Sequence, residues 1–296
     1  MPSLAGSVRP VTRHVRLREF LVGVEGLALF RHLVEGDDAT AEARIDEVRR
    51  IVGSEEEPTY GLGMDIPEFD ASAGYAEWSA TYDRPGNPLI SVEQPVVWAL
   101  LDALPAGRAL DAACGTGRHA AHLVERGHHV IGVDGSPEML DLARAHVPDA
   151  SFFEGDLRQL PVDDDEVDVV VCALALGHLD DLRPAVAELG RVVRPGGHVV
   201  VSDHHPGLAV TGGQALFQAA DGSLAFVRQH SHLHGEYLDA FASAGLDVVR
   251  CVEPRLGPEE AAAQGMAARF IPEATEAAFV GLPGALIWEL ARAQRS

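Results

Sequence analysis

From residue 108 onward, short apolar runs alternate with segments of helical character, and this alternation is the strongest constraint on the fold. The runs are RALDAA (108–113), HHVIGVD (128–134), ASFFEGD (150–156), VDVVVCALAL (167–176) and GGHVVVSD (196–203). They are nearly continuous in apolar residues and rich in valine, which is typical of strands that are buried on both faces. Such strands separated by helices form a parallel sheet covered on both sides. The sequence therefore predicts an α/β fold.

Residues 1–88 have a different pattern and are expected to form a helical extension, or cap, on a larger domain made of residues 89–296. The clearest helix is TAEARIDEVRRIVG (40–53), in which apolar side chains recur at helical spacing. Thr40 can cap its start and Gly53 can end it. The apolar stripe consists of Ala41, Ile45, Val48 and Val52.

The order of strands and helices breaks at about residues 204–234. ALFQAADGSLAFVRQHSH (215–232) is expected to be a hairpin that turns at Asp221 and Gly222. This insertion carries three histidines at alternate positions, His230, His232 and His234.

The charge and composition limit the classes of partner. The formal net charge is −22, and such an acidic surface repels nucleic-acid phosphates and anionic membranes. No apolar run reaches the length of a membrane span, and the first twenty residues do not have the pattern of a leader peptide. Three separated cysteines without a CxxC pair exclude a disulfide framework. We therefore expect a cytoplasmic protein that acts on a small molecule, and the sequence is compatible with a homodimer.

A glycine-rich turn follows the first strand, in ALDAACGTGRHA (109–120). Gly115 and Gly117 allow the backbone to turn sharply and to approach a ligand, and the helix that follows presents unpaired N–H groups. This spacing also fits a dinucleotide-binding turn, so the turn does not identify the ligand by itself.

Three aspartates at successive strand ends discriminate between ligands. Asp111 precedes the glycines, Asp134 ends the second strand and Asp156 follows the third. An anion at the glycine turn would repel a pyrophosphate but suits a cationic amino-acid group, while the other two can accept from ribose hydroxyls and from an exocyclic amine. In α/β folds ligands bind at this carboxyl edge. A ligand with a ribose, an adenine and a cationic tail fits better than a nicotinamide dinucleotide.

The stretches LDAACGTGRHA, VIGVDGSPEML, FFEGDLRQLP, VDVVVCALALGHL and VVRPGGHVVVSD resemble, in order and spacing, the motifs of class I S-adenosylmethionine-dependent methyltransferases. The resemblance implies a Rossmann-like, seven-stranded, mostly parallel sheet with an antiparallel last strand, for which GALIWELAR (284–292) is suited. It also implies S-adenosyl-L-methionine as cofactor. The implied cofactor-binding residues are Asp111, Gly115, Gly117, Arg118, Asp134, Met139, Asp156, Leu157 and Ala173.

The resemblance leaves the methyl acceptor open, and histidines are the main candidates for its chemistry. His178, His205 and His230 are candidate proton acceptors. If residues 230–234 are extended, side chains two apart share a face, and a divalent metal such as zinc or iron could bind. The predicted metal ligands are His178, His232 and His234. Tyr75, Trp78 and Tyr82 could line the acceptor pocket or anchor the extension.

The chain as a whole is similar to bacterial secondary-metabolism C-methyltransferases of 2-oxo acids, a group in which a histidine-bound metal is expected. In that reading the metal stabilises an enolate that accepts the methyl group. One alternative is metal-free methylation of an indole, phenol or amine with a histidine base. A more remote alternative is a cofactor-binding protein without catalytic activity.

Overall fold

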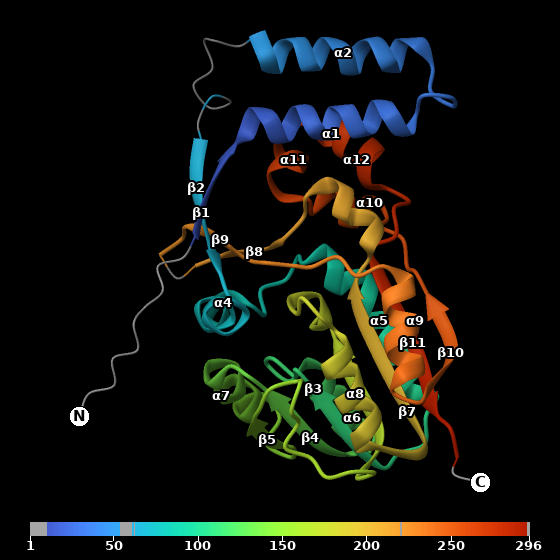
Figure 1. Ribbon diagram of the computed structural model, residues 1–296. Helices are drawn as coiled ribbons and strands as arrows, with labels where there is room; N and C mark the ends of the chain where they lie inside the picture. The colour runs from blue at the N-terminus through green and yellow to red at the C-terminus, as the bar shows by residue number, and fades with distance from the viewer. Residues whose placement is uncertain (1–10, 54–60, 62, 220, 295–296) are drawn as a thin grey trace.

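The computed structural model describes residues 11–53, 61, 63–219 and 221–294. Its centre is a seven-stranded sheet in the order β10-β11-β7-β6-β3-β4-β5 (Figure 1). The strands are β3 (Arg108–Ala112), β4 (His129–Asp134), β5 (Ser151–Glu154), β6 (Val167–Ala173), β7 (Val193–His204), β10 (Leu246–Val252) and β11 (Ala285–Arg292). β11 runs antiparallel to both its neighbours, and the other pairings are parallel. The predicted fold class, including the antiparallel last strand, is confirmed.

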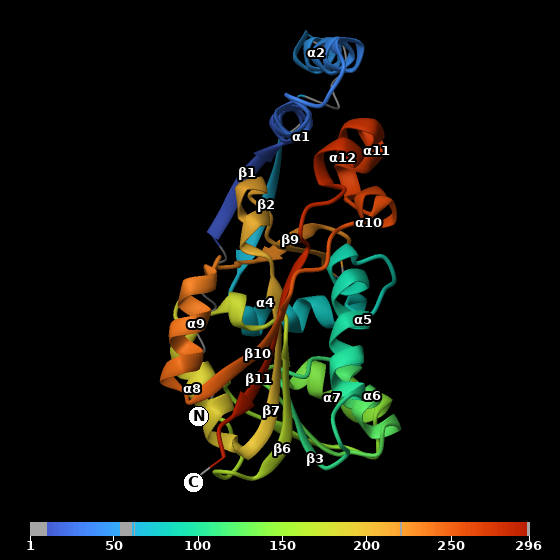
Figure 2. The same ribbon diagram turned by 90° about the vertical axis from the view of Figure 1, so that its right-hand side faces the viewer.

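Helices cover both faces of this sheet (Figure 2). One face packs against α5 (Pro88–Asp102), α6 (Arg118–Glu125) and α7 (Pro137–His146). The other face packs against α8 (Arg183–Val192) and α9 (His234–Ser243). The Val-rich strands are buried because each contributes side chains to both of these cores. None of the helices in the described parts of the chain combines the length and apolar character needed to cross a membrane.

The residues before α5 are more than a helical cap, because they also contribute strands. β1 (Val11–Arg16) and β2 (Gly63–Phe69) join β8 (Ala215–Gln218) and β9 (Leu224–Val227) in a second sheet of order β1-β2-β9-β8. The expectation of a purely helical extension was therefore wrong. The predicted hairpin at 215–232 is present as β8 and β9. The division into residues 1–88 and 89–296 stays a prediction.

Helices of the N- and C-terminal parts form a third core above the carboxyl edge of the large sheet (Figure 1). They are α1 (Leu17–Arg31), α2 (Asp38–Gly53), α10 (Pro258–Ala262), α11 (Gly265–Phe270) and α12 (Pro272–Phe279). Three short 3-10 helices complete the described elements: Ser79–Thr81, Leu176–His178 and Pro206–Thr211.

The short helix α4 (Ala71–Trp78) follows β2 and lies against β9. Asp70 caps it by accepting from Ala73 N–H at 2.9 Å. A Cβ on Gly74 would lie 2.3 Å from Cγ2 of Val227, so glycine is needed for this close approach. The second sheet thereby fixes α4 over the carboxyl edge of the large sheet.

Buried Glu25 makes the stability of the α1–α2 pair depend on pH. Its side chain is 0% exposed, and burial raises its pKa from 4.5 to about 7, although Arg44 acts in the opposite direction. A raised carboxyl pKa means that stability is fully present below about 4.5 and is lost as pH rises to about 7. Glu25→Gln is therefore expected to raise the free energy of unfolding at pH 8 by about 1–2 kcal/mol, and to change it little at pH 4. Urea unfolding at the two pH values measures this, and an equal effect at both would contradict the expectation.

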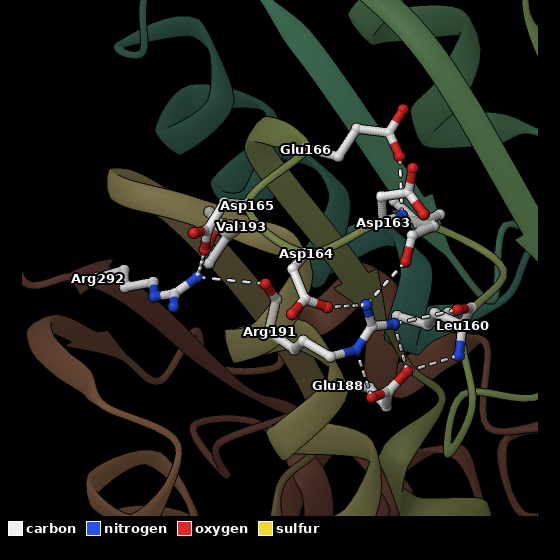
Figure 3. Close-up of polar contacts among 10 residues, drawn as sticks. Leu160, Asp163, Asp164, Asp165, Glu166, Glu188, Arg191, Val193 and Arg292 are labelled. Carbon is white, nitrogen blue, oxygen red and sulfur yellow. Dashed lines mark hydrogen bonds and ion pairs between the residues drawn. The ribbon is translucent and has the colours of Figure 1, made fainter.

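Arg191 on α8 fixes the acidic loop before β6 (Figure 3). Its guanidinium donates to Glu188 Oε1 and Oε2 at 2.7 Å each, to Asp164 Oδ1 at 2.7 Å and to Val162 O at 2.9 Å. It also donates to Leu160 O at 3.1 Å. The hydrogen bonds with Glu188 raise the pKa of Arg191 and lower that of Glu188. Glu188 of the same helix also accepts from Leu160 N–H at 2.8 Å, so these two side chains hold the loop to α8.

Replacing this side chain by one without charge should destabilise the protein. Arg191→Met is expected to lower the free energy of unfolding by about 2–4 kcal/mol, because it leaves two carboxylates and two carbonyls without this donor. The matched control is Arg183→Met, because the Arg183 side chain is 72% exposed in its ion pair with Asp181. This variant should change the free energy of unfolding by less than about 0.5 kcal/mol. Equal denaturation midpoints for the two variants would count against the role of Arg191.

Candidate active site

A cavity of about 740 Å³ lies at the carboxyl ends of β3, β4, β5 and β6, with α4 on its other side. Five of the nine predicted cofactor residues line it: Gly115, Asp134, Asp156, Leu157 and Ala173. They come from the ends of four parallel strands, whose carboxyl ends meet at one edge of the sheet. Their predicted contacts with a cofactor stay predictions, but their common location agrees with that role.

The glycine turn between β3 and α6 has an unusual backbone. Gly115 and Gly117 have φ of 52° and 87°, in the left-handed region where glycine has no steric penalty. Ala113 also lies there, with φ of 59°, which costs an alanine about 1 kcal/mol or more. The turn brings the N–H of Gly115 to Oδ2 of Asp134 at 2.8 Å. The turn and the end of β4 are therefore a single rigid unit on the cavity wall.

The two aspartates on the wall differ in their electrostatic environment. Burial raises the pKa of Asp134, although the N–H groups of Ser136 and Gly115 partly compensate. Asp156 is more open, and its pKa is lowered by the hydrogen bonds of Arg158, at 2.9 Å from Nε and 2.5 Å from Nη2. Each carboxylate oxygen can accept more than one hydrogen bond. Both side chains can therefore still accept from a ligand.

The other four predicted cofactor residues are not on the cavity wall. Asp111 is buried below the turn, where it accepts from Ala120 N–H at 2.8 Å, and burial raises its pKa to about 7. Arg118 points toward α5 and donates to Glu93, and Met139 is fully buried in α7. Gly117 supports the turn as the residue preceding α6. In the structure these residues lie on the side of the glycine turn that faces away from the cavity, because the start of α6 packs against the sheet.

The second half of the cavity is aromatic, and it contains the first predicted proton acceptor. His178 and Tyr75 both line the cavity, with Tyr75 Oη 2.8 Å from His178 Nε2. Tyr82 also lines it. Trp78 lies behind them, stacked on Tyr75 at 5.6 Å and on Phe217 at 5.2 Å between ring centroids. Of the aromatic side chains singled out in the sequence, Tyr75 and Tyr82 line the pocket, and Trp78 packs α4 against the second sheet.

The three alternating histidines do not share a face. β9 ends at Val227 and α9 begins at His234, so the intervening residues are not a strand. His230 N–H donates to Gly177 O at 2.6 Å, while His232 is buried with Nε2 2.8 Å from Leu179 O. His234 Nε2 instead lies 2.9 Å from Glu253 Oε1. The expected shared face is not formed, because the His232 ring is bonded to the loop after β6 and the His234 ring to Glu253.

The predicted metal ligands His178, His232 and His234 are consequently not brought together. Within residues 11–53, 61, 63–219 and 221–294, one group of three candidate ligands has atoms within 4.8 Å of one another: His205, His234 and Glu253. His205 Nδ1 accepts from Gly207 N–H at 2.9 Å, so its Nε2 carries the hydrogen that it donates to Glu253. A metal at Nε2 would require the opposite tautomer. This donor set therefore fits a metal poorly, and His205, a predicted proton acceptor, is not on the cavity wall.

Sequence reasoning missed the buried carboxylate of Glu93 on α5. It is 0% exposed and contacts Arg118 Nη1 at 2.9 Å and Ser202 Oγ at 2.7 Å. Burial alone would raise its pKa, but the nearby His119 ring and the charge of Arg118 outweigh this and lower it to about 2. An acid within the apolar run PLISVEQPVVWALL (88–101) was the available signal.

Comparisons with known proteins agree with this architecture. Residues 110–201 match the family model described as a methyltransferase domain. An uncharacterized methyltransferase of Mycobacterium tuberculosis is 40% identical over 136 residues, which are 46% of this chain and 54% of that protein. A demethylmenaquinone methyltransferase of Clavibacter sepedonicus is 36% identical over 140 residues, or 45% of this chain and 57% of the relative. The chain thus spans little more than half the length of these relatives.

Among solved structures, an S-adenosylmethionine-dependent methyltransferase of Mesorhizobium loti superposes with a TM-score of 0.52 and 24% identity. The superposition covers 68% of this chain and 98% of that one. This likeness concerns the fold, and the family match concerns the strands that carry the glycine turn and Asp134. Residues 110–201 therefore match a methyltransferase domain, and the large sheet has a fold shared with the S-adenosylmethionine-dependent methyltransferase of Mesorhizobium loti.

Proposed function

We propose that this chain is an S-adenosylmethionine-dependent methyltransferase that acts on a small molecule. The observation that carries the proposal is the cavity at the carboxyl edge of the sheet, where the glycine turn, Asp134 and Asp156 lie on one wall. In this proposal Asp134 accepts from the ribose hydroxyls, and Asp156 with the N–H of Leu157 contacts the adenine edge. Ala173, at the end of β6, would lie near the sulfonium.

The size of the cavity supports a small acceptor. Its volume of about 740 Å³ is within the range of sites for small ligands, about 300–1,000 Å³, and has to hold both cofactor and acceptor. The acidic chain, with a net charge of −22, disfavours a nucleic-acid acceptor.

The two acceptor classes expected from the sequence, 2-oxo acids and aromatic molecules, need different catalytic groups. A metal-stabilised enolate of a 2-oxo acid needs several donors facing one ion. His178 and His232 instead bond to different backbone carbonyls. Among the described residues, the one cluster of three candidate ligands contains His205, whose tautomer opposes a metal. A base for an aromatic acceptor needs one neutral imidazole, and burial lowers the pKa of His178 on the cavity wall. These observations favour the metal-free aromatic alternative.

Calorimetry with S-adenosylhomocysteine tests the cofactor half of the proposal. We expect one site per chain with a dissociation constant in the micromolar range. Incubation with S-adenosylmethionine and a panel of phenols, indoles and 2-oxo acids, followed by mass spectrometry, tests methyl transfer. Absence of S-adenosylhomocysteine binding in folded protein would overturn the proposal, whereas binding without transfer to any acceptor would favour the non-catalytic alternative.

A further inference from the structure

The hydrogen bonds of His178 determine which of its nitrogens carries the proton. Nδ1 lies 3.0 Å from the carbonyl oxygen of Arg228, and a carbonyl can only accept, so Nδ1 carries a hydrogen. In the neutral ring Nε2 is then an acceptor, and Tyr75 donates its hydroxyl hydrogen to it at 2.8 Å. Burial lowers the pKa of His178, so the neutral form is favoured at neutral pH. His178 is therefore a base whose lone pair faces Tyr75.

Tyr75 and His178 both line the cavity, and the Tyr75 hydroxyl occupies the lone pair of this base. Both ring nitrogens of His178 have partners, so a proton from an acceptor reaches Nε2 through the Tyr75 oxygen. Burial raises the pKa of Tyr75 well above its usual value of 10, and the hydroxyl therefore keeps a hydrogen to pass on. Stacking of Trp78 at 5.6 Å and the edge of Tyr82 at 6.0 Å hold the Tyr75 ring in place.

Other titratable groups also face this pair. His178 is influenced by the buried carboxyl of Asp203 and by His230, which act in opposite directions on its pKa. Tyr75 is influenced by Tyr82, Asp134 and Asp203, all of which raise its pKa. Since Asp203 favours a proton on both Tyr75 and His178, it favours the outcome in which the acceptor's proton leaves one hydrogen on Tyr75 and one more on the imidazole.

The charges on the cavity wall restrict the acceptor. In the part of the chain that the structure describes, the charged wall residues are Asp134, Glu154, Asp156 and Arg158. The guanidinium of Arg158 is engaged by Asp156 through two hydrogen bonds. A carboxylate on the acceptor would thus meet three acids and a guanidinium that is already paired. The wall suits a cationic methyl donor and an uncharged acceptor.

We propose that Tyr75 is a catalytic proton relay to His178, and that the acceptor is an uncharged, planar aromatic molecule with a hydroxyl or ring N–H group. This inference rests on the proposed function and adds the class of acceptor to it. As the acceptor oxygen or nitrogen attacks the methyl carbon, a new bond to carbon forms and the S–CH3 bond breaks, leaving a neutral thioether. The acceptor proton passes to Tyr75 Oη while the Tyr75 hydrogen passes to His178 Nε2. The resulting imidazolium then releases its proton to water.

A coloured phenol measures this proton transfer without turnover. 4-Nitrophenol is titrated into the complex with S-adenosylhomocysteine, and its ionised form is followed by absorbance. We expect bound 4-nitrophenol to ionise at a pH about one unit lower than in water, because its proton passes to His178 and the phenolate is then paired with an imidazolium, so that no net charge is added to the acidic wall. The control ligand is 4-nitrobenzoate, which is similar in size to 4-nitrophenol but carries a full negative charge. Its dissociation constant, measured by calorimetry at pH 6, is expected to be at least about tenfold larger than that of 4-nitrophenol.

Two variants separate proton transfer from packing. Tyr75→Phe should still bind 4-nitrophenol but lose the shift in its ionisation. Trp78→Phe, which keeps the hydroxyl–imidazole bond and changes only the stacking, should retain the shift. A retained shift in Tyr75→Phe would overturn the relay, and equal or tighter binding of 4-nitrobenzoate, or no binding of 4-nitrophenol, would overturn the uncharged acceptor. Binding of S-adenosylhomocysteine is measured first, so failure of the proposed function is seen independently.

Discussion

Asp134→Ala is expected to weaken S-adenosylhomocysteine binding by about 100-fold or more. Two charge-assisted hydrogen bonds to the ribose hydroxyls are worth about 1.5 kcal/mol or more each, and together they account for that factor. The same carboxylate accepts from Gly115 and Ser136 at 2.8 and 2.9 Å. Its loss therefore also loosens the turn on which the cofactor rests. Calorimetry on the purified variant measures the change.

Two further variants show whether the loss is specific. Asp134→Asn keeps one oxygen acceptor for the turn but has no charge, so its affinity should lie between those of the wild type and Asp134→Ala. Asp141→Ala removes an acid on the same helix–strand unit whose side chain is 80% exposed, and should bind like the wild type. Unchanged affinity in Asp134→Ala would remove the main support for the cofactor assignment.

Glu93→Gln is expected to lower the free energy of unfolding by about 3 kcal/mol near neutral pH. The amide can keep the contact with Ser202 but cannot neutralise Arg118, which is only 20% exposed. An uncompensated charge in such a place costs about 3–5 kcal/mol when its partner is lost entirely. The matched control is Gln94→Ala, because Gln94 accepts from the same guanidinium at 3.2 Å without carrying a charge. Urea denaturation should show a small effect for the control.

The pH dependence of Glu93 provides a second check. Its pKa of about 2 is below the ordinary 4.5, so its contribution is present above about 4.5 and is lost as pH falls toward 2. The difference in stability between the wild type and Glu93→Gln should therefore shrink across this window. A difference that stays constant from pH 6 to pH 3 would mean that the carboxylate is not stabilised by its charged neighbours.

The large sheet could be predicted from the sequence because its central strands, such as β6 and β7, are buried on both faces. A run as apolar as VDVVVCALAL is rarely found outside a buried strand. Because such strands alternate with helices along the chain, they are expected to pair in parallel. The second sheet could not be predicted in the same way. β1 is exposed along its whole length, and β2 pairs with β9 over only two residue pairs. Strands with so little buried surface have no periodic signal.

The candidate site also contains a part that could be predicted from the sequence and a part that could not. Residues at strand ends, such as Asp134 and Ala173, lie together on the cavity wall because the topology brings those ends to one edge, and their contacts with a cofactor stay predictions. The directions of the histidines after β9 could not be predicted, since they depend on single contacts such as that of His232 with Leu179. Alternation in sequence predicts a shared face only where a strand continues, and β9 ends at Val227.

The pairing of β2 with β9 also affects the order in which the protein can assemble. Glu68 and Phe226 are neighbours in the second sheet, so this sheet cannot close until most of the chain has left the ribosome. The glycine turn and Asp134 belong to strands that are synthesised and paired earlier, and contacts between distant segments form slowly because a long loop must close first. The wall on which the cofactor is proposed to bind can therefore form before Tyr75 is placed opposite it. Under the proposed function, a nascent chain would acquire affinity for S-adenosylmethionine before it acquires a place for the acceptor.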